Sequence, residues 1–473
     1  MKMETSRTKQ WPQYLAAITA TISLAITGSH IGWTSPSLPF LKGPDSHVPI
    51  TSDEASWVAS FYVLGSVPGN IIAAFLVDRY GRKQSLLAAV VPLFFGWILI
   101  LIAGNPYVLY ASRFISGLGQ GIVYVACPMY IGEIADSNIR GTLGSFIKLM
   151  VTLGELYAHA IGPFVSYDVL SYLCAILPGI FYLSFIWMPE SPYFYLMHER
   201  RADAEESLMQ LRLYTSKDDL NEDLQEMHDA MVNDLSSRGY AWQLFDTPGN
   251  RRAFIVSFGL QLILQFSGLA AIESYTQEMF EESDSPISAG TMVILLGVFQ
   301  LGAGVAAAIL VEKMGRRPLF LFTTFVAGIT LAISGIFYFL KLGLKLEMEG
   351  KGWVLDSSII MYEIAVALGL SPLSYMMLGE LFPTNVKGIA VTLANVWASL
   401  LAFFVSKMYQ VIADGFGMYV SFGWFSCSCF LGTVFIGLLV PETKGKTLIQ
   451  IQDELNGRKK NVKRMVPEVS VIA

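Results

Sequence analysis

Long apolar runs alternate with short polar segments along almost the whole chain. About 20 apolar residues are needed to cross the hydrocarbon core of a bilayer as a helix. Twelve runs reach that length: 14–36, 56–77, 84–103, 107–131, 142–165, 169–188, 253–280, 290–311, 318–341, 357–381, 388–412 and 417–440. The seventh carries Glu273 and Glu278, so we expect its outer end to be hydrated or distorted. The pattern predicts an all-α membrane protein.

One long polar stretch, residues 190–251, divides the apolar runs into two groups of six. Apolar residues recur within it at helical spacing: Leu220, Leu224, Met227, Met231 and Leu235. We expect short amphipathic helices there, lying under the membrane domain and joining its halves. The predicted organisation is a cytoplasmic tail at 1–13, a six-helix bundle at 14–189, the cytoplasmic linker at 190–251, a second six-helix bundle at 252–440 and a cytoplasmic tail at 441–473.

Three short polar motifs occur once in each half, in the same order. They are DRYGRK at 78–83 and EKMGRR at 312–317, GEIADSNIRG at 132–141 and GELFPTNVKG at 379–388, and PESP at 189–192 and PET at 441–443. Each lies at the end of an apolar segment. A doubled half with charged motifs at its helix ends is typical of a secondary transporter.

Composition and charge placement agree with a membrane protein. The chain is 53% hydrophobic and 15% charged, with a mean hydropathy of +0.50, outside the range of a soluble domain of this length. If the N-terminus is cytoplasmic, most of the 32 Lys and Arg residues fall in inner loops and tails. The outer loops hold Lys42, Lys341, Lys345 and Lys351. This positive-inside bias predicts that both termini are cytoplasmic.

Signatures of catalytic chemistry are missing from the sequence. It contains no Walker-type loop, no Ser/His/Asp set and no metal-binding cluster, and its basic residues are spread over loops instead of forming a patch. We therefore expect neither an enzyme nor a cofactor, metal or nucleic-acid partner. The expected partners are a small polar solute and the lipid bilayer, with no obligate protein partner.

The motifs resemble those of the major facilitator superfamily, in its sugar-porter branch, over roughly residues 14–450. The matching segments are GWTSP at 32–36, DRYGR at 78–82, RFISGLGQG at 113–121, EIADSNIR at 133–140, QFSG at 265–268, GELFPTNVKG at 379–388 and PETKGKTL at 441–448. The chain is most similar to the insect facilitated trehalose transporters. The resemblance implies twelve transmembrane helices in two pseudo-symmetric six-helix bundles, with a sugar as the transported solute.

The charged residues of the repeated motifs are candidates for gating ion pairs. They are Asp78, Arg82, Glu133, Arg140, Glu312, Arg316, Arg317, Glu380 and Lys387. Charges partly buried at the membrane surface need partners. The resemblance implies that these residues pair between opposite halves when the inner side is closed and separate when it opens. The alternative is that they only fix loop topology.

A sugar site needs amides or hydroxyls for the hydroxyl groups and an aromatic face for the ring. The later apolar segments supply such groups near the middle of the membrane: Gln261, Gln265, Tyr275, Gln300 and Tyr375. Amides in lipid are unfavourable when unpaired, so we expect them to face a central cavity. Interhelical hydrogen bonds are the alternative role for the glutamines.

The fifth apolar segment carries a stripe of polar residues on one helix face: Lys148, Thr152, Glu155 and His159. One hypothesis pairs Lys148 with Glu155 in the central cavity, where they would contact a polar or charged solute. A bolder version couples Glu155 and His159 to protons. In the alternative, Lys148 extends to the inner membrane surface.

Several positions depart from the sugar-porter pattern while the loop motifs are kept. Lys148 stands where the family has a sugar-binding Gln, Tyr375 replaces a Trp, and Leu264 and Ala270 replace a Gln and an Asn. The leading interpretation is a facilitative transporter, a uniporter of hexose or trehalose in the plasma membrane. Facilitation is favoured because no carboxylate at membrane depth is compelling as a proton carrier. The alternatives are a non-sugar or proton-coupled solute carrier and a transport-deficient sugar receptor.

Overall fold

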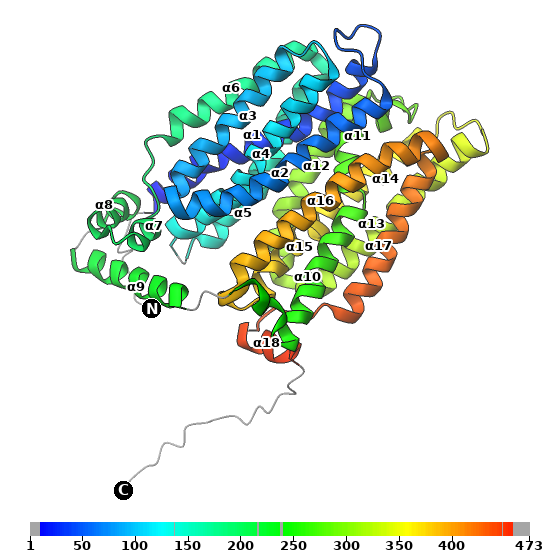
Figure 1. Cartoon of the computed structure of the whole chain (residues 1–473). Helices are drawn as coiled ribbons and strands as arrows, with labels where there is room; N and C mark the ends of the chain where they lie inside the picture. Colours follow the sequence, from blue (N-terminus) through cyan, green and yellow to red (C-terminus); the bar gives the residue numbers. More distant parts are fainter. Residues whose placement is uncertain (1–9, 137, 215–216, 237–239, 447, 457–473) are drawn as a thin grey trace.

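The computed structural model describes residues 10–136, 138–214, 217–236, 240–446 and 448–456. Every regular element in these ranges is a helix. Two bundles lie side by side, one from the first half of the chain and one from the second (Figure 1). The predicted tails at 1–13 and 441–473 lie largely outside the described residues.

The first bundle contains six long helices. They are α1 (Trp11–Lys42), α2 (Ser52–Tyr80), α3 (Arg82–Leu101), α4 (Pro106–Ile134), α5 (Arg140–Ile161) and α6 (Tyr167–Phe185), with a short 3-10 turn at Gly162–Phe164. Gly65 of α2 and Gly117 of α4 bring these two helices into backbone contact. A Cβ at Gly65 would lie 2.1 Å from the carbonyl oxygen of Phe114, and one at Gly117 would lie 2.0 Å from that of Tyr62.

The second bundle repeats this arrangement with two interrupted helices. Its elements are α10 (Pro248–Phe266), α11 (Leu269–Glu281), α12 (Ala289–Met314), α13 (Arg316–Tyr338), α14 (Gly352–Ala365), α15 (Ser371–Leu381), α16 (Thr384–Phe416) and α17 (Met418–Leu439), with π-helical turns η3 (Phe339–Gly343) and η4 (Val366–Leu370). Among the described residues, 11 helical spans are long and apolar enough to cross a membrane. The remaining predicted segment, the fifth, is α5, a helix packed along α1 whose polar stripe lowers its hydropathy.

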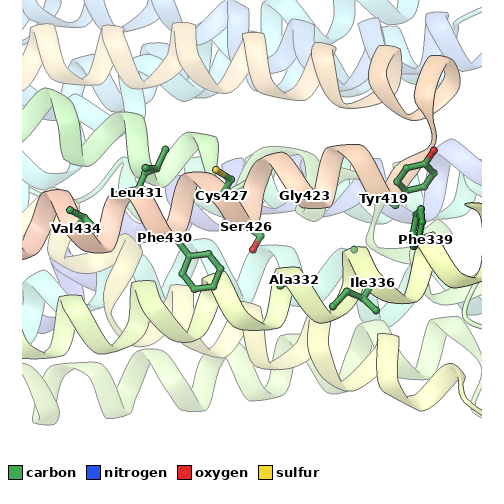
Figure 2. A pocket seen from close by; sticks show the side chains of 11 residues that line it. Ala332, Ile336, Phe339, Tyr419, Gly423, Ser426, Cys427, Phe430, Leu431 and Val434 are labelled. Atoms are coloured by element: carbon green, nitrogen blue, oxygen red, sulfur yellow. The ribbon is translucent and has the colours of Figure 1, made fainter.

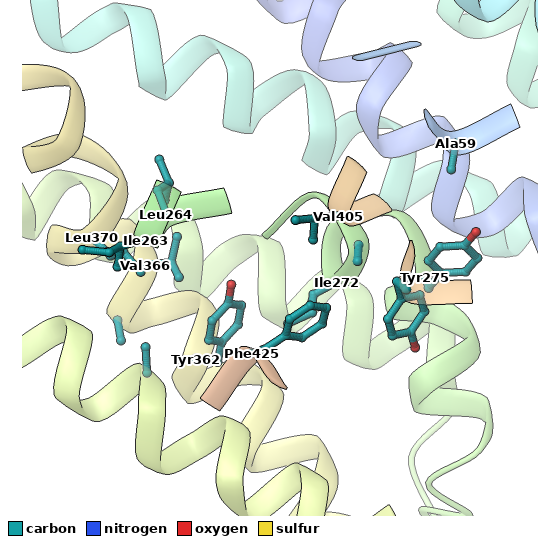
Figure 3. Close-up of a cluster of buried hydrophobic side chains, with 14 of the residues drawn as sticks. Ala59, Ile263, Leu264, Ile272, Tyr275, Tyr362, Val366, Leu370, Val405 and Phe425 are labelled. Carbon is teal, nitrogen blue, oxygen red and sulfur yellow. The ribbon is translucent and has the colours of Figure 1, made fainter. Parts of the chain in front are cut away.

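The seventh predicted segment is interrupted in its middle, not at its outer end. Gly268 separates α10 from α11 with a left-handed φ of +89°. A Cβ at this glycine would lie 2.4 Å from the Phe425 ring, so the position needs a glycine for both conformation and space. Figure 3 shows the apolar cluster around this break, with Tyr362 and Phe425 beside Ile272.

The tenth predicted segment is interrupted by η4, the π-helical turn between α14 and α15. Pro372 follows this turn and has no backbone N–H to donate to the preceding helical turn. Gly369 lies within η4 against α13, where an added Cβ would lie 2.4 Å from the Thr323 hydroxyl oxygen. Both interruptions fall in the second bundle, near the residues that the sequence predicts for the solute site.

Short helices cover one end of the bundles, which we call the termini end. They are α7 (Pro192–Met197), α8 (Arg201–Arg212), α9 (Lys217–Ser236), the 3-10 turn η2 (Ala241–Phe245) and α18 (Leu448–Leu455) (Figure 1). Leu220, Leu224 and Met231 of α9 are buried against α7 and α8 in a small apolar cluster. The side chain of Leu235, the last residue of the predicted stripe, is outside the described part. We call the other end of the bundles, which carries loops 43–51 and 344–351, the opposite end.

Candidate functional site

Polar side chains from both bundles meet at the interface between them. α5 supplies Lys148, Glu155 and His159. Glu273 of α11 and Glu363 of α14 are contributed by the second bundle. Lys148 interacts electrostatically with all three carboxylates, of which Glu363 is only 1% exposed. We call Lys148, Glu155, Glu273 and Glu363 the interface cluster.

Close contact between α1 and α5 fixes the position of Glu155. Cβ atoms at Gly28 and Gly32 would lie 2.0 Å from the Val151 carbonyl oxygen and 2.7 Å from the Glu155 carbonyl oxygen. α5 therefore packs on α1 through backbone contacts. Its polar stripe faces α11, α12 and α14 across the interface, where Glu155 and His159 line a cavity together with residues of those helices.

The cavity is small and polar. Its volume is about 10 Å³, room for about one water molecule. Glu155, His159, Glu273, Gln300 and Glu363 line it, and the Gln300 amide donates to Glu363 Oε2 at 3.4 Å. Within the described residues, His159 Nε2 and Glu363 Oε1 are buried without a hydrogen-bond partner. Buried polar atoms are rarely left unpaired, so the cavity has unfilled hydrogen-bonding capacity.

The interface cluster contains more negative than positive charge. Three carboxylates face a single ammonium, and among the described residues Lys148 forms no ion pair with Glu155 within 4.0 Å. Its electrostatic partners lie in the cluster, which argues against an extension to the membrane surface near Arg140. Ionised carboxylates at membrane depth are costly without partners.

The other predicted site residues lie in two different environments. Tyr375 of α15 is 47% exposed and interacts electrostatically with Lys148 and Glu273, so it adjoins the interface cluster. Gln261 and Gln265 are buried one turn apart on α10, and neither polar side-chain atom of Gln261 has a hydrogen-bond partner in the described chain. Tyr275 lies apart from the cluster and packs against Tyr409, with 5.1 Å between ring centroids.

Glu363 is a site residue that the sequence predictions do not include. It lies inside the tenth apolar segment, where a lone carboxylate at membrane depth is itself a signal of function. The sequence pattern indicates Glu273 only as a source of hydration or distortion in the seventh segment. Neither residue belongs to a repeated motif, and their proximity to α5 depends on how the two bundles meet.

At the termini end of the first bundle, the three repeated motifs converge. Arg82 pairs with Glu133 at 2.8 Å, and Ser191 donates a hydrogen bond to the same carboxylate. The Glu190 carboxylate accepts the backbone N–H groups of Arg82 and Lys83 at 3.0 and 2.9 Å, at the N-terminus of α3. An anion at a helix N-terminus accepts the free N–H groups and interacts favourably with the helix dipole.

The second bundle repeats this arrangement. Arg316 approaches Glu380 to 3.4 Å, and the Thr443 hydroxyl donates to the Glu380 carboxylate. Glu442 accepts the backbone N–H groups of Arg316 and Arg317, both at 3.1 Å, at the N-terminus of α13. The motif pairs of the sequence thus form one repeated structural unit per bundle.

The two anchoring carboxylates differ in their titration. Burial raises the pKa of Glu190 above its usual range, although backbone N–H groups oppose the shift. Burial also acts on the more exposed Glu442, but the backbone N–H groups of Lys444, Arg316 and Arg317 outweigh it and lower the pKa. Glu442 is therefore the anchor whose ionised form the fold stabilises.

In this conformation the motif ion pairs described above do not cross between bundles. The pairs Arg82–Glu133 and Arg316–Glu380 each lie within one bundle. Three other gating candidates have partners within their own bundle: Glu312 is 3.3 Å from Arg316, Arg140 donates to the Ala135 carbonyl, and Arg317 donates to the Gly437 carbonyl. The last two lie near helix ends, Asp78 at the end of α2 and Lys387 at the start of α16. The resemblance implies that such residues pair between the bundles when the inner side is closed. The pairs Arg82–Glu133 and Arg316–Glu380 do not form that arrangement in this conformation.

The ion pairs that join the bundles lie at the opposite end instead. Lys407 of α16 pairs with Asp53 of α2 at 2.6 Å, and Lys42 of α1 pairs with Glu278 of α11 at 2.5 Å. The Gln277 backbone N–H donates to the Ser35 hydroxyl at 3.0 Å. This is the conformation in which the halves are joined at the opposite end, and the interface cluster lies on the termini side of that closure.

A second concave region lies away from the polar interface. It is a groove between α13 and α17 (Figure 2). Ile336 and Leu431 on its walls are 59% and 67% exposed. An apolar groove on a membrane-facing surface suits contact with lipid tails and lacks the polar groups that a hydroxylated solute needs.

Comparison with known proteins identifies relatives over most of the chain. A family model described as "Sugar (and other) transporter" matches residues 15–455. A facilitated trehalose transporter Tret1 of Bombyx mori is 29% identical over 468 residues, covering 98% of this chain and 91% of that protein. The Tret1 of Drosophila virilis is 29% identical over 458 residues, covering 96% of this chain, which spans only 50% of that longer protein.

Solved structures show the same fold. The inward-open xylose transporter XylE from E. coli superimposes with a TM-score of 0.78 at 22% identity, covering 93% of this chain and 99% of that one. A structure of the proton:xylose symporter XylE bound to 6-bromo-6-deoxy-D-glucose gives a TM-score of 0.75, also at 22% identity, with 94% and 99% covered. The structure is thus an all-α membrane protein of the major facilitator fold.

Proposed function

Because this chain belongs to the sugar (and other) transporter family, a family of non-enzymatic carriers, we propose that it moves a hexose or trehalose across the plasma membrane by alternating access. The solute binds between the bundles, near the middle of the membrane. The termini end faces the cytoplasm, as the distribution of Lys and Arg predicts.

The observation that carries this proposal is the asymmetric pairing of the two bundles. They are joined by Lys42–Glu278 and Lys407–Asp53 at one end, while the motif pairs at the other end stay within each bundle. Separation of the first set and formation of inter-bundle contacts by the second would reverse the accessible side. A carrier with two such sets opens to one aqueous face at a time, unlike a channel.

The groups near the interface cluster suit a hydroxylated solute. Gln300 offers an amide and Tyr375 a half-exposed aromatic ring. Gln265 supplies another buried amide on α10. A hexose or trehalose presents hydroxyl groups to such amides and a ring face to an aromatic side chain. The trehalose transporters among the relatives make trehalose the first solute to test.

Uptake by oocytes that express the chain tests the proposal. Radiolabelled glucose, fructose, trehalose, polyols and amino sugars are compared in the wild-type chain, in Lys148→Gln and in Gln225→Ala. We expect saturable uptake of glucose or trehalose by the wild type, and the same uptake by Gln225→Ala, which alters an exposed residue of α9. If only Lys148→Gln moves hexoses, the natural solute lies outside the ordinary sugars.

Proton coupling is a second candidate mode that a specific observation favours. The sequence favours facilitation on the ground that no membrane carboxylate is compelling as a proton carrier. The structure changes that premise, because Glu155 and Glu363 are 4% and 1% exposed and both line one cavity with Glu273.

A further inference from the structure

We infer that the interface cluster binds the proton that drives transport, so that this carrier is a proton-coupled symporter. The inference rests on the proposed function and specifies its energy source. One carboxylate among Glu155, Glu273 and Glu363 gains a proton from the opposite end and releases it to water at the termini end. Only an O–H bond forms and breaks in this cycle.

The charge balance of the cluster supplies the first argument. Lys148 neutralises at most one of the three carboxylates, and Glu155 and Glu363 are buried. Unbalanced carboxylates in this environment require a further positive charge. A second, independent observation is that, in the described part of the chain, His159 Nε2 and Glu363 Oε1 are buried without a hydrogen-bond partner. His159 is only 7% exposed and lines the cavity, so a proton bound there would gain hydrogen-bonding partners.

The cavity volume excludes organic cations, and its lining does not suit a metal ion. A volume of about 10 Å³ has no room for an organic cation. In the described part of the chain, no group of three His, Cys, Asp or Glu side chains is arranged to hold a metal ion. A proton needs no added volume and removes one negative charge directly.

Among the described residues, no second cation lines the cavity, and Arg113, which interacts with Tyr62, donates hydrogen bonds to the His30 carbonyl and the Thr34 hydroxyl. The other described groups that line the cavity or interact with the cluster are uncharged side chains: Ile31 of α1, Tyr62 of α2, Tyr124 of α4, Thr276 of α11, Gln300 of α12 and Tyr375 of α15. The titratable His159 of α5 also lines the cavity. The charge of the cluster is therefore set by its own four members, by His159 and by any bound proton.

The position of the cluster explains how protonation could control the conformation. Glu155 belongs to the first bundle, whereas Glu273 and Glu363 belong to the second. Ionised carboxylates on the two bundles repel one another across the interface that moves during transport. A bound proton reduces this repulsion and favours the conformations in which the bundles approach, which is a coupling of proton binding to alternating access.

Transport in proteoliposomes tests the coupling. The purified chain is given an inward proton gradient of one pH unit, and accumulation of radiolabelled glucose and trehalose is followed. One proton per solute predicts accumulation up to about tenfold, because one pH unit corresponds to a tenfold ratio. An uncoupler should abolish it. We expect Glu363→Gln and Glu273→Gln to reduce accumulation to the external concentration.

A matched control lies on the same helix. Asp356 of α14 is a buried carboxylate two turns before Glu363, 2% exposed and outside the interface cluster. Asp356→Asn should accumulate solute like the wild type. Counterflow, the exchange of labelled for unlabelled sugar without a proton gradient, measures transport activity independently of proton coupling. A wild type that exchanges sugar but never accumulates it would overturn proton coupling and leave the proposed function standing.

Infrared spectroscopy tests proton binding without any solute. Carboxyls in water are ionised above about pH 6, so a carboxylic-acid carbonyl band that grows between pH 8 and pH 6 reports buried groups. We expect a band of equal size in the wild type and in Asp356→Asn, and a smaller band in the double variant Glu273→Gln, Glu363→Gln, in which Glu190 and other buried carboxyls remain. A band of equal size in the wild type and the double variant would overturn the inference, whereas failure of every sugar to exchange would overturn the proposed function.

Discussion

Two glutamates show how single residues anchor the repeated motifs. Glu190 and Glu442 each place a carboxylate on the first backbone N–H groups of a helix, α3 in one bundle and α13 in the other. Gly81 and Gly315 precede these helices with φ of +98° and +92°. The positive φ turns the chain sharply between two long helices, a conformation that glycine adopts without strain.

Replacement of Glu442 should give a pH-dependent loss of stability. Its folded pKa is lowered, so the ionised carboxylate contributes stability above the unfolded pKa of about 4.3, and this contribution disappears as the pH falls through the folded pKa. We expect Glu442→Gln to destabilise the protein by about 1 kcal/mol at pH 7, because solvent screens this partly buried group. Thermal unfolding at pH 7 and pH 3.5 measures it. A loss of stability of equal size at both pH values would contradict the lowered pKa of Glu442. Glu347→Gln, in an exposed loop, is the control.

At the scale of elements, the interrupted helices shape the solute pathway. The break at Gly268 lies between Gln265 at the end of α10 and Glu273 in α11. It is stabilised from the side, where the Tyr362 hydroxyl and the Ser267 hydroxyl lie 3.0 Å apart and Tyr362 also donates to the Ser267 carbonyl at 3.1 Å. These bonds satisfy backbone and side-chain groups that an unbroken helix would satisfy internally.

Gly268→Ala should destabilise the break. The substitution places a Cβ at positive φ and 2.4 Å from the Phe425 ring, so we expect a loss of more than about 1 kcal/mol, the usual cost of a left-handed conformation for a residue with a side chain. Gly302→Ala in α12 is the matched control, because its Cβ would meet no atom within 4 Å. Thermal unfolding compares the two. Equal stability of both variants would show that the break tolerates a side chain.

At the scale of the whole molecule, a small number of contacts determines which end is open. The bundles touch mainly through α2 with α16, α5 with α12, and α1 with α11. At mid-depth Ser66 of α2 donates to Ser399 of α16 at 2.8 Å. The ion pairs at the opposite end add to these contacts, and Lys407 also lies 4.2 Å from the centroid of the Trp57 ring.

Lys407→Gln should shift the carrier toward opening at the opposite end. Asp53 is 67% exposed, so the lost pair is worth about 0.5–1 kcal/mol, or about a two- to fivefold change in the population ratio. Spin labels at Asp45→Cys and Glu347→Cys, in a Cys427→Ser background, report the distance between the two loops. We expect a larger long-distance population.

Lys345→Gln provides the control for that experiment. It removes a positive charge from the exposed loop at the same end, without the 2.6 Å contact that Lys407 makes to Asp53. The distance distribution should match the wild type. An unchanged distribution in Lys407→Gln as well would show that this ion pair does not hold the opposite end closed.

Much of the architecture could be predicted from the pattern of residues. The predicted membrane segments correspond to the long helices, including α5, and Leu220, Leu224 and Met231 form the buried face of a linker helix. The partners of the motif charges were harder to predict. Arg82 and Arg316 pair within their own bundles, because the conformation of the whole carrier decides which helix ends are near one another.

The sequence by itself determined that the chain crosses a membrane and that its two halves are alike. These properties depend on local chemistry, since each apolar run must be buried in lipid and each motif recurs at a helix end. Only the tertiary structure decided that Glu155, Glu273 and Glu363 share one cavity. Their meeting depends on helix rotation, on the close packing of α1 with α5 and on the contact between bundles, which no short stretch of sequence encodes.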